Sequence, residues 1–351
     1  MLKFKGHLKI HRWWDGQLPL MMALVYFELS VSKHAPAVWY ALLALVLFLV
    51  SSVGIASFGY LLNDYTDRDQ DRQSGVHNLL ARTRKRKIVI AFAAVILVSW
   101  APWLALPYNP GILALIAFEY FLFIAYSVKP IRLKERGLPG SAADSLYGYA
   151  VPLTVALLLF AQICHNTVHW WQIVPVISWS FVLGLRHIFV HQLKDSAHDE
   201  VTGAQTSVTT LGWDRVFHAL AYRVLPVECL LFATVLIALG VSNPLLPVGY
   251  LGYLAWSLYY HKRTSLWREA NPWKLPINDR LLFTTVTLMS RFQRHWFPVL
   301  MLPALIVHAP VYLVFALVHF LLFENGFRPL FQYEIPEIKR IYRINRFGGT
   351  C

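Results

Sequence analysis

Aspartate residues are concentrated in two short stretches of this 351-residue chain. The sequence contains ten aspartates, and six of them fall within these two stretches. Like charges packed this closely repel one another, so the clustering requires an explanation such as a bound cation. The six residues are Asp64, Asp67, Asp69, Asp71, Asp195 and Asp199.

The first stretch places three carboxylates on one face if it is helical. Asp64, Asp67 and Asp71 are spaced i, i+3 and i+7. Asn63 lies one turn from Asp67, and Asp69 points elsewhere. A row of oxygen ligands at the end of a helix suits Mg²⁺, which binds through one or two carboxylates and keeps waters and substrate phosphates as its other ligands.

The second stretch repeats this arrangement, because Asp195 and Asp199 are spaced i and i+4. Two such faces opposite each other would hold two ions with a diphosphate between them, and the ions would neutralise charge on the leaving group. A solvated helix end is the simpler explanation for either stretch alone. Both stretches together, with these spacings, favour a metal site.

A basic turn lies between the two acidic stretches, at residues 126–137 (YSVKPIRLKERG). Pro130 breaks the helix that precedes it. Lys129, Arg132 and Arg136 could bind phosphate oxygens. An ordinary basic loop on the cytoplasmic side of a membrane protein is the alternative explanation.

The composition indicates that these motifs belong to a membrane protein. Hydrophobic residues make up 57% of the chain and charged residues 15%, against about 25% charged in a typical soluble domain. The formal net charge is +13, but the positive residues lie between apolar segments. Anionic lipid headgroups and an anionic substrate are therefore the expected partners, and nucleic acid is not.

Nine apolar segments are candidate membrane helices, so one helical bundle is expected. The links between them alternate between basic and nearly uncharged. By the positive-inside rule, the N-terminus and both acidic stretches face the cytoplasm. The candidate segments are 16–32, 38–62, 88–107, 111–126, 145–163, 170–192, 222–241, 245–260 and 297–323.

The end of the chain conflicts with this count. Nine spans place the C-terminus outside, yet residues 324–351 carry five Lys or Arg residues. Either this tail is an exception or the count is off by one. The apolar run within 281–296 is too short to span a membrane, and we expect an interfacial helix there. We divide the chain into a transmembrane domain, 1–323, and a basic tail, 324–351.

Three sequence patterns together resemble the hallmark segments of the UbiA superfamily of intramembrane prenyltransferases. They are N-D-x-x-D-x-x-x-D at 63–71, Y-S-x-K-P-x-R-L-K-x-R-G at 126–137 and D-x-x-x-D-x-x-x-G-x-x-T at 195–206. The resemblance covers residues 10–325, approximately. It implies an all-α integral membrane protein, a bundle of nine transmembrane helices with a central cavity, a cytosolic polar cap and Mg²⁺ bound through the two aspartate motifs.

The resemblance also implies roles for individual residues. Asn78 stands where part of a family turn with Asn, Arg and Pro would lie. The implied metal ligands and catalytic residues are Asp64, Asp67, Asp71, Asp195 and Asp199. The implied contacts to the diphosphate are Asn63, Lys129, Arg132, Arg136 and Lys194.

The helix before the second acidic stretch carries candidate residues for an acceptor pocket. Arg186 lies away from the ends of a helix at 170–192 and could bind a carboxylate on an aromatic acceptor. His187 or His191 could serve as the base. Internal hydrogen bonds and a helix-end charge are the alternative explanation.

We therefore predict a Mg²⁺-dependent prenyltransferase that transfers the chain of an isoprenoid diphosphate to an aromatic or quinone-precursor acceptor within the bilayer. A terpene cyclase built on the same cage is the alternative that needs no second substrate. A sugar phosphate or a tetrapyrrole is a further candidate acceptor. A non-catalytic transporter or scaffold is disfavoured, because a transporter would place its ionisable residues near the membrane midplane.

Overall fold

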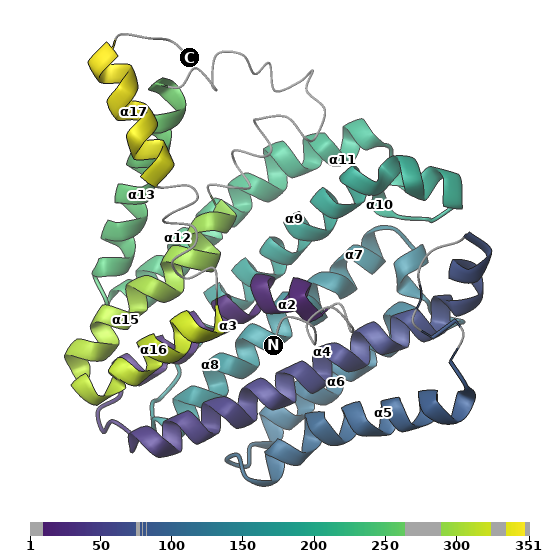
Figure 1. Cartoon of the computed structure of the whole chain (residues 1–351), viewed down its shortest axis with the longest axis horizontal. Helices are drawn as coiled ribbons and strands as arrows, with labels where there is room; N and C mark the ends of the chain where they lie inside the picture. Colours follow the sequence, from purple (N-terminus) through teal and green to yellow (C-terminus); the bar gives the residue numbers. More distant parts are fainter. Residues whose placement is uncertain are drawn as a thin grey trace.

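A computed structural model describes residues 10–74, 78, 80–81, 83–263, 289–323 and 335–347, and every regular element in this part of the chain is helical (Figure 1). Six of the described helical segments are long and apolar enough to cross a membrane. The chain is thus a multi-pass membrane protein. The six segments are Val38–Asp69, Lys85–Leu104, Pro110–Ser127, Leu138–Ile163, Trp170–Ala197 and Trp213–Gly240.

The helices follow one another with short connections. Two π-helical turns, η3 (Leu146–Ala150) and η4 (Leu220–Val224), join α7 to α8 and α11 to α12, so each pair forms one continuous rod. The α-helices are α2 (Ile10–Gly16), α3 (Leu18–Ser30), α4 (Val38–Ser74), α5 (Lys85–Trp100), α6 (Pro110–Ser127), α7 (Leu138–Ser145), α8 (Val151–Ile163), α9 (Trp170–Thr202), α10 (Ser207–Leu211), α11 (Trp213–Ala219), α12 (Leu225–Gly240), α13 (Leu245–Arg263), α15 (Phe297–His308), α16 (Leu313–Leu322) and α17 (Ile335–Phe347). The remaining short turns are η1 (Ala101–Leu104), η2 (Leu133–Glu135), η5 (Phe292–Trp296) and η6 (Pro310–Tyr312).

The core of the bundle forms around α3. This helix is apolar on all sides, as expected of a helix surrounded by protein rather than one lying at a surface. All of its residues from Leu18 to Leu29 are buried. It packs against α15 and α8, and these contacts join a helix near the start of the chain to one near its end.

The predicted span 297–323 is two helices rather than one. Ala309 has an extended backbone, with φ −150° and ψ 107°, and Pro310 has no N–H with which to continue the helix. α15 and α16 pack against each other and lie side by side in Figure 1. The predicted count of nine helices is therefore not confirmed, and α3 and Pro310–Leu322 are shorter apolar helices than the six candidate spans.

Contacts at the two ends of α16 show its direction relative to α3. The indole Nε1 of Trp14, just before α3, donates a hydrogen bond to the carbonyl of Leu322 at 3.0 Å. Beyond the other end of α3, the Tyr312 hydroxyl donates to the carbonyl of Pro36 at 2.7 Å. α16 thus runs antiparallel to α3. The chain leaves α16 beside the start of α3.

Half of the predicted interfacial helix at 281–296, residues 281–288, lies outside the described residues. Its described end, from Met289, is helical and continues through η5 directly into α15. This part of it belongs to the same rod as α15 rather than to a separate surface helix.

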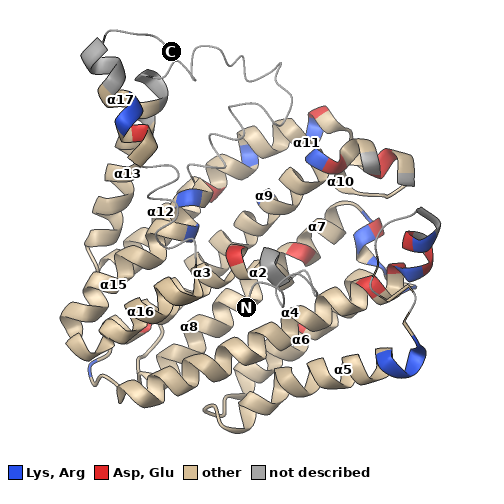
Figure 2. Ribbon diagram, viewed as in Figure 1, with Lys and Arg blue, Asp and Glu red and all other residues tan. Residues whose placement is uncertain are grey.

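Charged residues gather at one end of the bundle, while its middle is mostly uncharged (Figure 2). The C-terminal ends of α4 and α9 carry acidic residues, and the beginning of α5 carries Lys85, Arg86 and Lys87. This polar end holds the two aspartate stretches predicted from the sequence.

Candidate functional site

The length of α4 carries the first aspartate stretch to the polar end of the bundle. Its 37 residues extend about 56 Å at 1.5 Å per residue, well beyond a hydrocarbon core of about 30 Å. Asp64 lies at the edge of the packed bundle and is 7% exposed, while Asp67 and Asp71 follow on the next two turns and are partly exposed.

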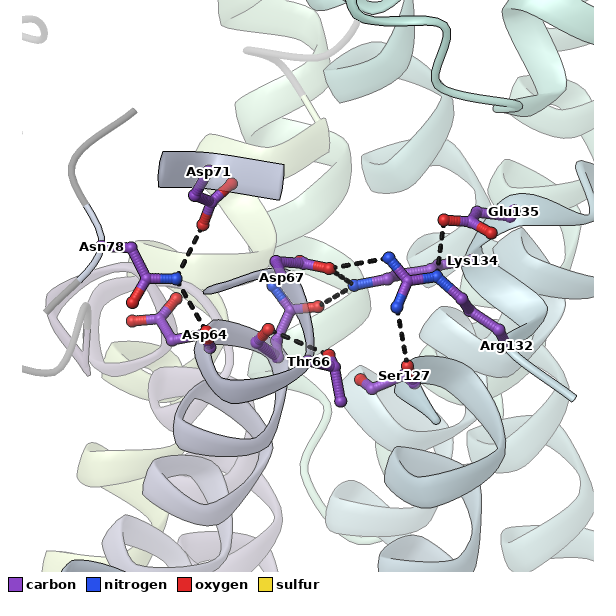
Figure 3. A network of polar contacts seen from close by, with 10 residues as sticks. Asp64, Thr66, Asp67, Asp71, Asn78, Ser127, Arg132, Lys134 and Glu135 are labelled. Atoms are coloured by element: carbon purple, nitrogen blue, oxygen red, sulfur yellow. Dashed lines mark hydrogen bonds and ion pairs between the residues drawn. The ribbon is translucent and has the colours of Figure 1, made fainter. Parts of the chain in front are cut away.

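Asp67 is the point where the basic turn meets α4 (Figure 3). Its Oδ1 accepts a hydrogen bond from Nη2 of Arg132 at 3.0 Å and another from Nζ of Lys134. Lys134 also donates to the amide oxygen of Asn63 at 2.9 Å. The basic turn predicted to bind phosphate therefore contacts the acidic stretch predicted to bind metal.

The backbone and neighbours of Arg132 hold its side chain in place. Arg132 adopts a left-handed conformation with φ 39°, and its side chain is buried. Its Nη1 donates to the carbonyl of Ser127 at 3.3 Å, and its Nε donates to Glu135. The side chain of Lys134 is 13% exposed. Burial lowers the pKa of its ammonium group, and the negative charge of Asp67 partly opposes this shift.

Asn78 links two positions of the first stretch. Its Nδ2 donates to the backbone carbonyl of Asp64 at 2.7 Å and to the Asp71 carboxylate at 2.8 Å. Its own amide oxygen accepts from the backbone N–H of Leu80 at 2.8 Å. Asn78 thus ties the segment after α4 back onto the aspartate face.

The second stretch lies at the end of α9. His191 and Asp195 form a contact of 2.8 Å between Nδ1 and Oδ2, with side chains that are 56% and 48% exposed. Asp199 is partly exposed, and its backbone carbonyl accepts from Ala204 as the helix ends at Gly203, which has φ 71°. Exposed carboxylates at a helix end are accessible to a ligand from the aqueous side.

A tyrosine pair and an unpredicted aspartate connect the two stretches. Tyr126 at the end of α6 is within electrostatic reach of Asp67 and Asp199. It packs edge-to-face on Tyr147 at 5.3 Å between ring centres, and the Tyr147 hydroxyl donates to Asp144. The ends of α4, α6, α7 and α9 therefore converge on one polar region.

Asp144 and Lys134 are the residues at this site that sequence reasoning missed. Asp144 lies near the end of α7 and directly before the predicted apolar segment 145–163, and this position could have identified it. It lies within electrostatic reach of His191. Lys134 belongs to the basic turn, but spacing alone did not identify it as the lysine of that turn that contacts Asp67.

The other predicted basic residues do not join the Asp67 network. Lys129 and Lys194 are exposed, and Arg136 is exposed with its Nη2 donating to the carbonyl of Pro130 at 2.8 Å. They line the same polar end and are accessible from solvent.

The donor set fits Mg²⁺ that arrives with a diphosphate. Within the described ranges, no three His, Cys, Asp or Glu side chains gather closely enough to hold a metal ion by themselves. Mg²⁺ is commonly bound by one or two carboxylates, with water and substrate phosphates as its remaining ligands, so a closed protein cage is not required. Hard oxygen donors next to Arg132 and Lys134 suit an ion and an anionic substrate bound together.

Arg186 lies in a closed polar network rather than facing an open cavity. It is fully buried, and its guanidinium is paired with both carboxylate oxygens of Glu228, with a distance of 3.0 Å from Nη2 to Oε1. Ser290 and Gln293 accept its other hydrogen bonds at 2.8 and 3.2 Å. His187, the next residue, instead stacks on Tyr149 with ring centres 5.3 Å apart.

An apolar pocket lies deeper in the bundle, between α2, α3, α4, α6 and α8. Its cavity volume is about 20 Å³. Its lining includes three aromatic side chains, Trp13, Phe48 and Trp103, and one carboxyl group, that of Glu119.

The chain is similar to known proteins in both sequence and fold. A family model described as the UbiA prenyltransferase family matches residues 20–285. A digeranylgeranylglyceryl phosphate synthase from Ignicoccus hospitalis is 27% identical over 200 residues, which cover 57% of this chain and 62% of that protein. The match thus spans less than two thirds of the relative's length.

Solved structures show the same helical arrangement. A UbiA homolog from Archaeoglobus fulgidus bound to GPP and Mg²⁺ has a TM-score of 0.58 and 17% identity, and covers 86% of this chain and 99% of that one. An apo UbiA homolog from Aeropyrum pernix K1 has a TM-score of 0.54 and 15% identity, and covers 85% and 97% of the two chains. At these identities the similarity shows the fold alone.

Proposed function

Since the chain belongs to the UbiA prenyltransferase family and is a membrane prenyltransferase, we propose that it uses Mg²⁺ to ionise an isoprenoid diphosphate and transfers the prenyl chain to an aromatic or quinone-precursor acceptor. The observation that carries this proposal is the contact of Arg132 and Lys134 with Asp67. Cations and carboxylates from distant parts of the chain meet there, as a metal-bound diphosphate requires.

The polar end of the bundle would bind the diphosphate. Arg132 and Lys134 would pair with its oxygens, and Lys129, Arg136 and Lys194 would contribute further contacts from their exposed positions. The side chains that would hold Mg²⁺ are Asp64, Asp67, Asp71, Asp195 and Asp199. When bound, Mg²⁺ neutralises the charge that develops on the leaving diphosphate.

The apolar interior would hold the prenyl chain and protect its reactive end. Aromatic faces such as those of Trp13 and Phe48 stabilise a positive charge without bonding to it. Exclusion of water prevents hydrolysis of the allylic cation. His191, which contacts Asp195, or His187 would accept the proton that an aromatic acceptor loses after the new C–C bond forms.

The relatives support this choice of donor and suggest a second acceptor. Solved structures of the Archaeoglobus fulgidus homolog contain GPP or DMAPP together with Mg²⁺. The relative from Ignicoccus hospitalis is named for a glyceryl phosphate product. A glyceryl phosphate is therefore the second candidate acceptor for this chain.

We place the polar end of the bundle in the cytoplasm. The basic residues of the turn at 126–137 and of the start of α5 lie at this end, and Lys3, Lys5, Lys9 and Arg12 precede the first apolar segment. The positive-inside rule assigns such residues to the cytoplasmic side. The N-terminus and the site would then share that side.

The test is a turnover assay on the full chain in lipid nanodiscs, with GPP and longer homologues as donors. Each donor is tested with Mg²⁺ and with EDTA, first without acceptor and then with 4-hydroxybenzoate or a prenylated glyceryl phosphate. Mg²⁺-dependent transfer that requires an acceptor is expected. Diphosphate release with a hydrocarbon product and no acceptor would instead indicate a cyclase. Absence of Mg²⁺-dependent turnover with every combination would contradict the proposal.

A further inference from the structure

A second cationic cluster lies inside the bundle, apart from the aspartate stretches. Arg294 of η5 points toward α9, where its Nη2 lies 2.9 Å from Nε2 of His187. The His187 ring stacks on Tyr149 of η3 with an angle of 5° between the rings, and Tyr149 lies within hydrogen-bonding reach of Arg294. A Cβ at Gly16 would lie 3.7 Å from Nη2 of Arg294, so the end of α2 closes the cluster.

Two arginines inside the bundle, Arg186 and Arg294, differ in whether a carboxylate balances their charge. Arg186 is neutralised by Glu228, and each of its three guanidinium nitrogens donates a hydrogen bond. Arg294 forms no ion pair with a carboxylate, Asp15 and Asp144 included, within the described part of the chain. The Arg294 side chain is only partly exposed, and a partly buried charge without a counter-ion favours an anion supplied by a ligand.

Two buried polar atoms in the same place are also without a partner. They are Nε of Arg294, a donor, and Oε1 of Gln17, an acceptor, at the residue that precedes α3. Gln17 faces η3, because a Cβ at Gly148 would lie 4.0 Å from its Nε2. Buried polar groups are normally paired, so a donor and an acceptor left open together indicate a missing polar molecule.

The position of the cluster relates it to the reaction site. His187, His191 and Asp195 are spaced i, i+4 and i+8, so they follow one face of α9. His187 lies about 12 Å further into the bundle than Asp195 at 1.5 Å per residue. A molecule anchored at Arg294 would therefore extend along this face toward the aspartate stretches.

We propose that Arg294, with His187 and Gln17, binds the acidic group of the acceptor, and that the acceptor is a hydroxylated anion. This inference rests on the proposed prenyl transfer. The guanidinium fork of Arg294 would pair with a carboxylate or a phosphate, both of which present the required oxygens. Oε1 of Gln17 would accept a hydrogen bond from a hydroxyl group. We therefore assign to Arg294 the acceptor-binding role predicted for Arg186, because the charge of Arg186 is already balanced by the Glu228 carboxylate.

The test compares acidic acceptors with neutral analogues in the full chain, in nanodiscs. The variants are Arg294→Gln, which removes the charge, and Arg294→Lys, which keeps the charge and loses the fork. Arg291→Gln is the matched control, since Arg291 is three residues away and pairs with Glu337 at 2.9 Å. The acidic probes are 4-hydroxybenzoate and a prenylated glyceryl phosphate, and 4-hydroxybenzamide and the glycerol ether without phosphate are their neutral counterparts.

We expect Arg294→Gln to raise the KM of the acidic acceptor about 10- to 100-fold, as expected for the loss of a charge-assisted hydrogen bond. The KM of the isoprenoid diphosphate should change less than about twofold. Arg294→Lys should show an intermediate effect, and Arg291→Gln none. The acidic probe that loses affinity identifies a carboxylate or a phosphate as the group bound.

An unchanged KM for both acidic acceptors in either folded Arg294 variant would overturn the inference, as would equal use of acidic and neutral acceptors by the unmodified protein. Arg294→Lys serves as the test if Arg294→Gln does not fold. Equilibrium binding of 4-hydroxybenzoate and glycerol phosphate, without donor, separates this inference from the proposed function. Loss of anion binding in Arg294→Gln supports the site even if no donor is turned over, and retained binding contradicts it.

Discussion

Arg132 and Asp67 lie 65 positions apart in the chain and form an ion pair of 3.0 Å at the polar end of the bundle. Both side chains are largely buried, with 9% and 18% of their surface exposed. Lys134 approaches the same carboxylate oxygen. The pairing fixes the basic turn against the first aspartate stretch, so neither element is positioned independently of the other.

Replacement of Arg132 or Lys134 should weaken binding of the isoprenoid diphosphate. We expect Arg132→Gln and Lys134→Gln each to raise the KM of the isoprenoid diphosphate about 10- to 100-fold. Each substitution removes a charge-assisted hydrogen bond and one of the positive charges that neutralise Asp67. Steady-state kinetics with GPP would measure this. Arg68→Gln is the control, since among the described residues the ion pair of Arg68 is with the exposed Asp69, at 3.4 Å. Equal KM values in all three variants would contradict the assignment.

Removal of the metal or of its carboxylates should abolish turnover without unfolding the protein. We expect EDTA to stop activity and Mg²⁺ to restore it. Asp64→Asn, Asp67→Asn and Asp195→Asn should each lower kcat by at least about 100-fold, since charge neutralisation of the leaving group contributes several kcal/mol. Asp69→Asn, whose carboxylate is 83% exposed and faces away, should remain within about twofold of the unmodified protein. Near-full activity in the first three variants would exclude the metal site.

Asn78 should matter for both stability and metal response. Asn78→Ala removes the donor that reaches the Asp64 carbonyl and the Asp71 carboxylate, and it removes the acceptor of the buried Leu80 N–H. We expect a loss of about 1–3 kcal/mol in the free energy of unfolding and a higher Mg²⁺ concentration for half-maximal activity. Thermal unfolding in detergent and a Mg²⁺ titration would measure these effects.

The matched control for Asn78 is Asn109→Ala at the other end of the bundle. Asn109 caps α6 by accepting from the N–H groups of Gly111 and Ile112. Its loss should lower stability by about 1 kcal/mol and leave the Mg²⁺ titration unchanged. An identical Mg²⁺ response in both variants would show that Asn78 is purely structural.

The pair of Arg186 and Glu228 should be needed for stability. Glu228→Gln or Arg186→Met leaves one buried charge unpaired, and such a change costs about 3–5 kcal/mol. The double variant Arg186→Met with Glu228→Leu should recover most of this loss, because two apolar side chains replace two charges. Thermal unfolding of the three variants gives the answer. A single variant as stable as the unmodified protein would show that the pair is not structural.

Local spacing was sufficient to predict the faces of α4 and α9. Asp64, Asp67 and Asp71 fall on successive turns of one helix, so their relation depends only on helical periodicity. The partner of Arg186 could not be predicted in this way, because Glu228 lies 42 residues away on another helix. Such pairs depend on how helices pack, and one sequence does not specify which faces meet.

Hydropathy was likewise sufficient to identify the six candidate spans, but not the number of helices in the bundle. Residues 297–323 form one apolar run, and their composition does not distinguish one long helix from two short ones. The break depends on Pro310 and on the contact of Tyr312 with Pro36, which joins the turn to a loop at the start of the chain. Only the fold brings these residues together.

This break leads to a prediction about membrane topology. Because α16 returns along α3, the chain after Phe323 should emerge on the side where Trp14 lies, and the basic residues of α17 should face the cytoplasm with the N-terminus. A continuous ninth span would place them outside. α17 packs on α13, and Glu337 pairs with Arg291 at 2.9 Å.

Cysteine labelling in intact cells would measure this topology. In a background without native cysteines, we expect a membrane-impermeant maleimide to label Lys33→Cys, in the exposed loop between α3 and α4, but not Lys339→Cys, on α17. Permeabilisation should make both positions reactive, since Lys339 is exposed to solvent. Labelling of both positions in intact cells would mean that α16 does not return to the cytoplasmic side. The bilayer would then separate α17 from the basic turn. The basic residues of α17 would lie outside the cell, and the positive-inside rule would not account for them.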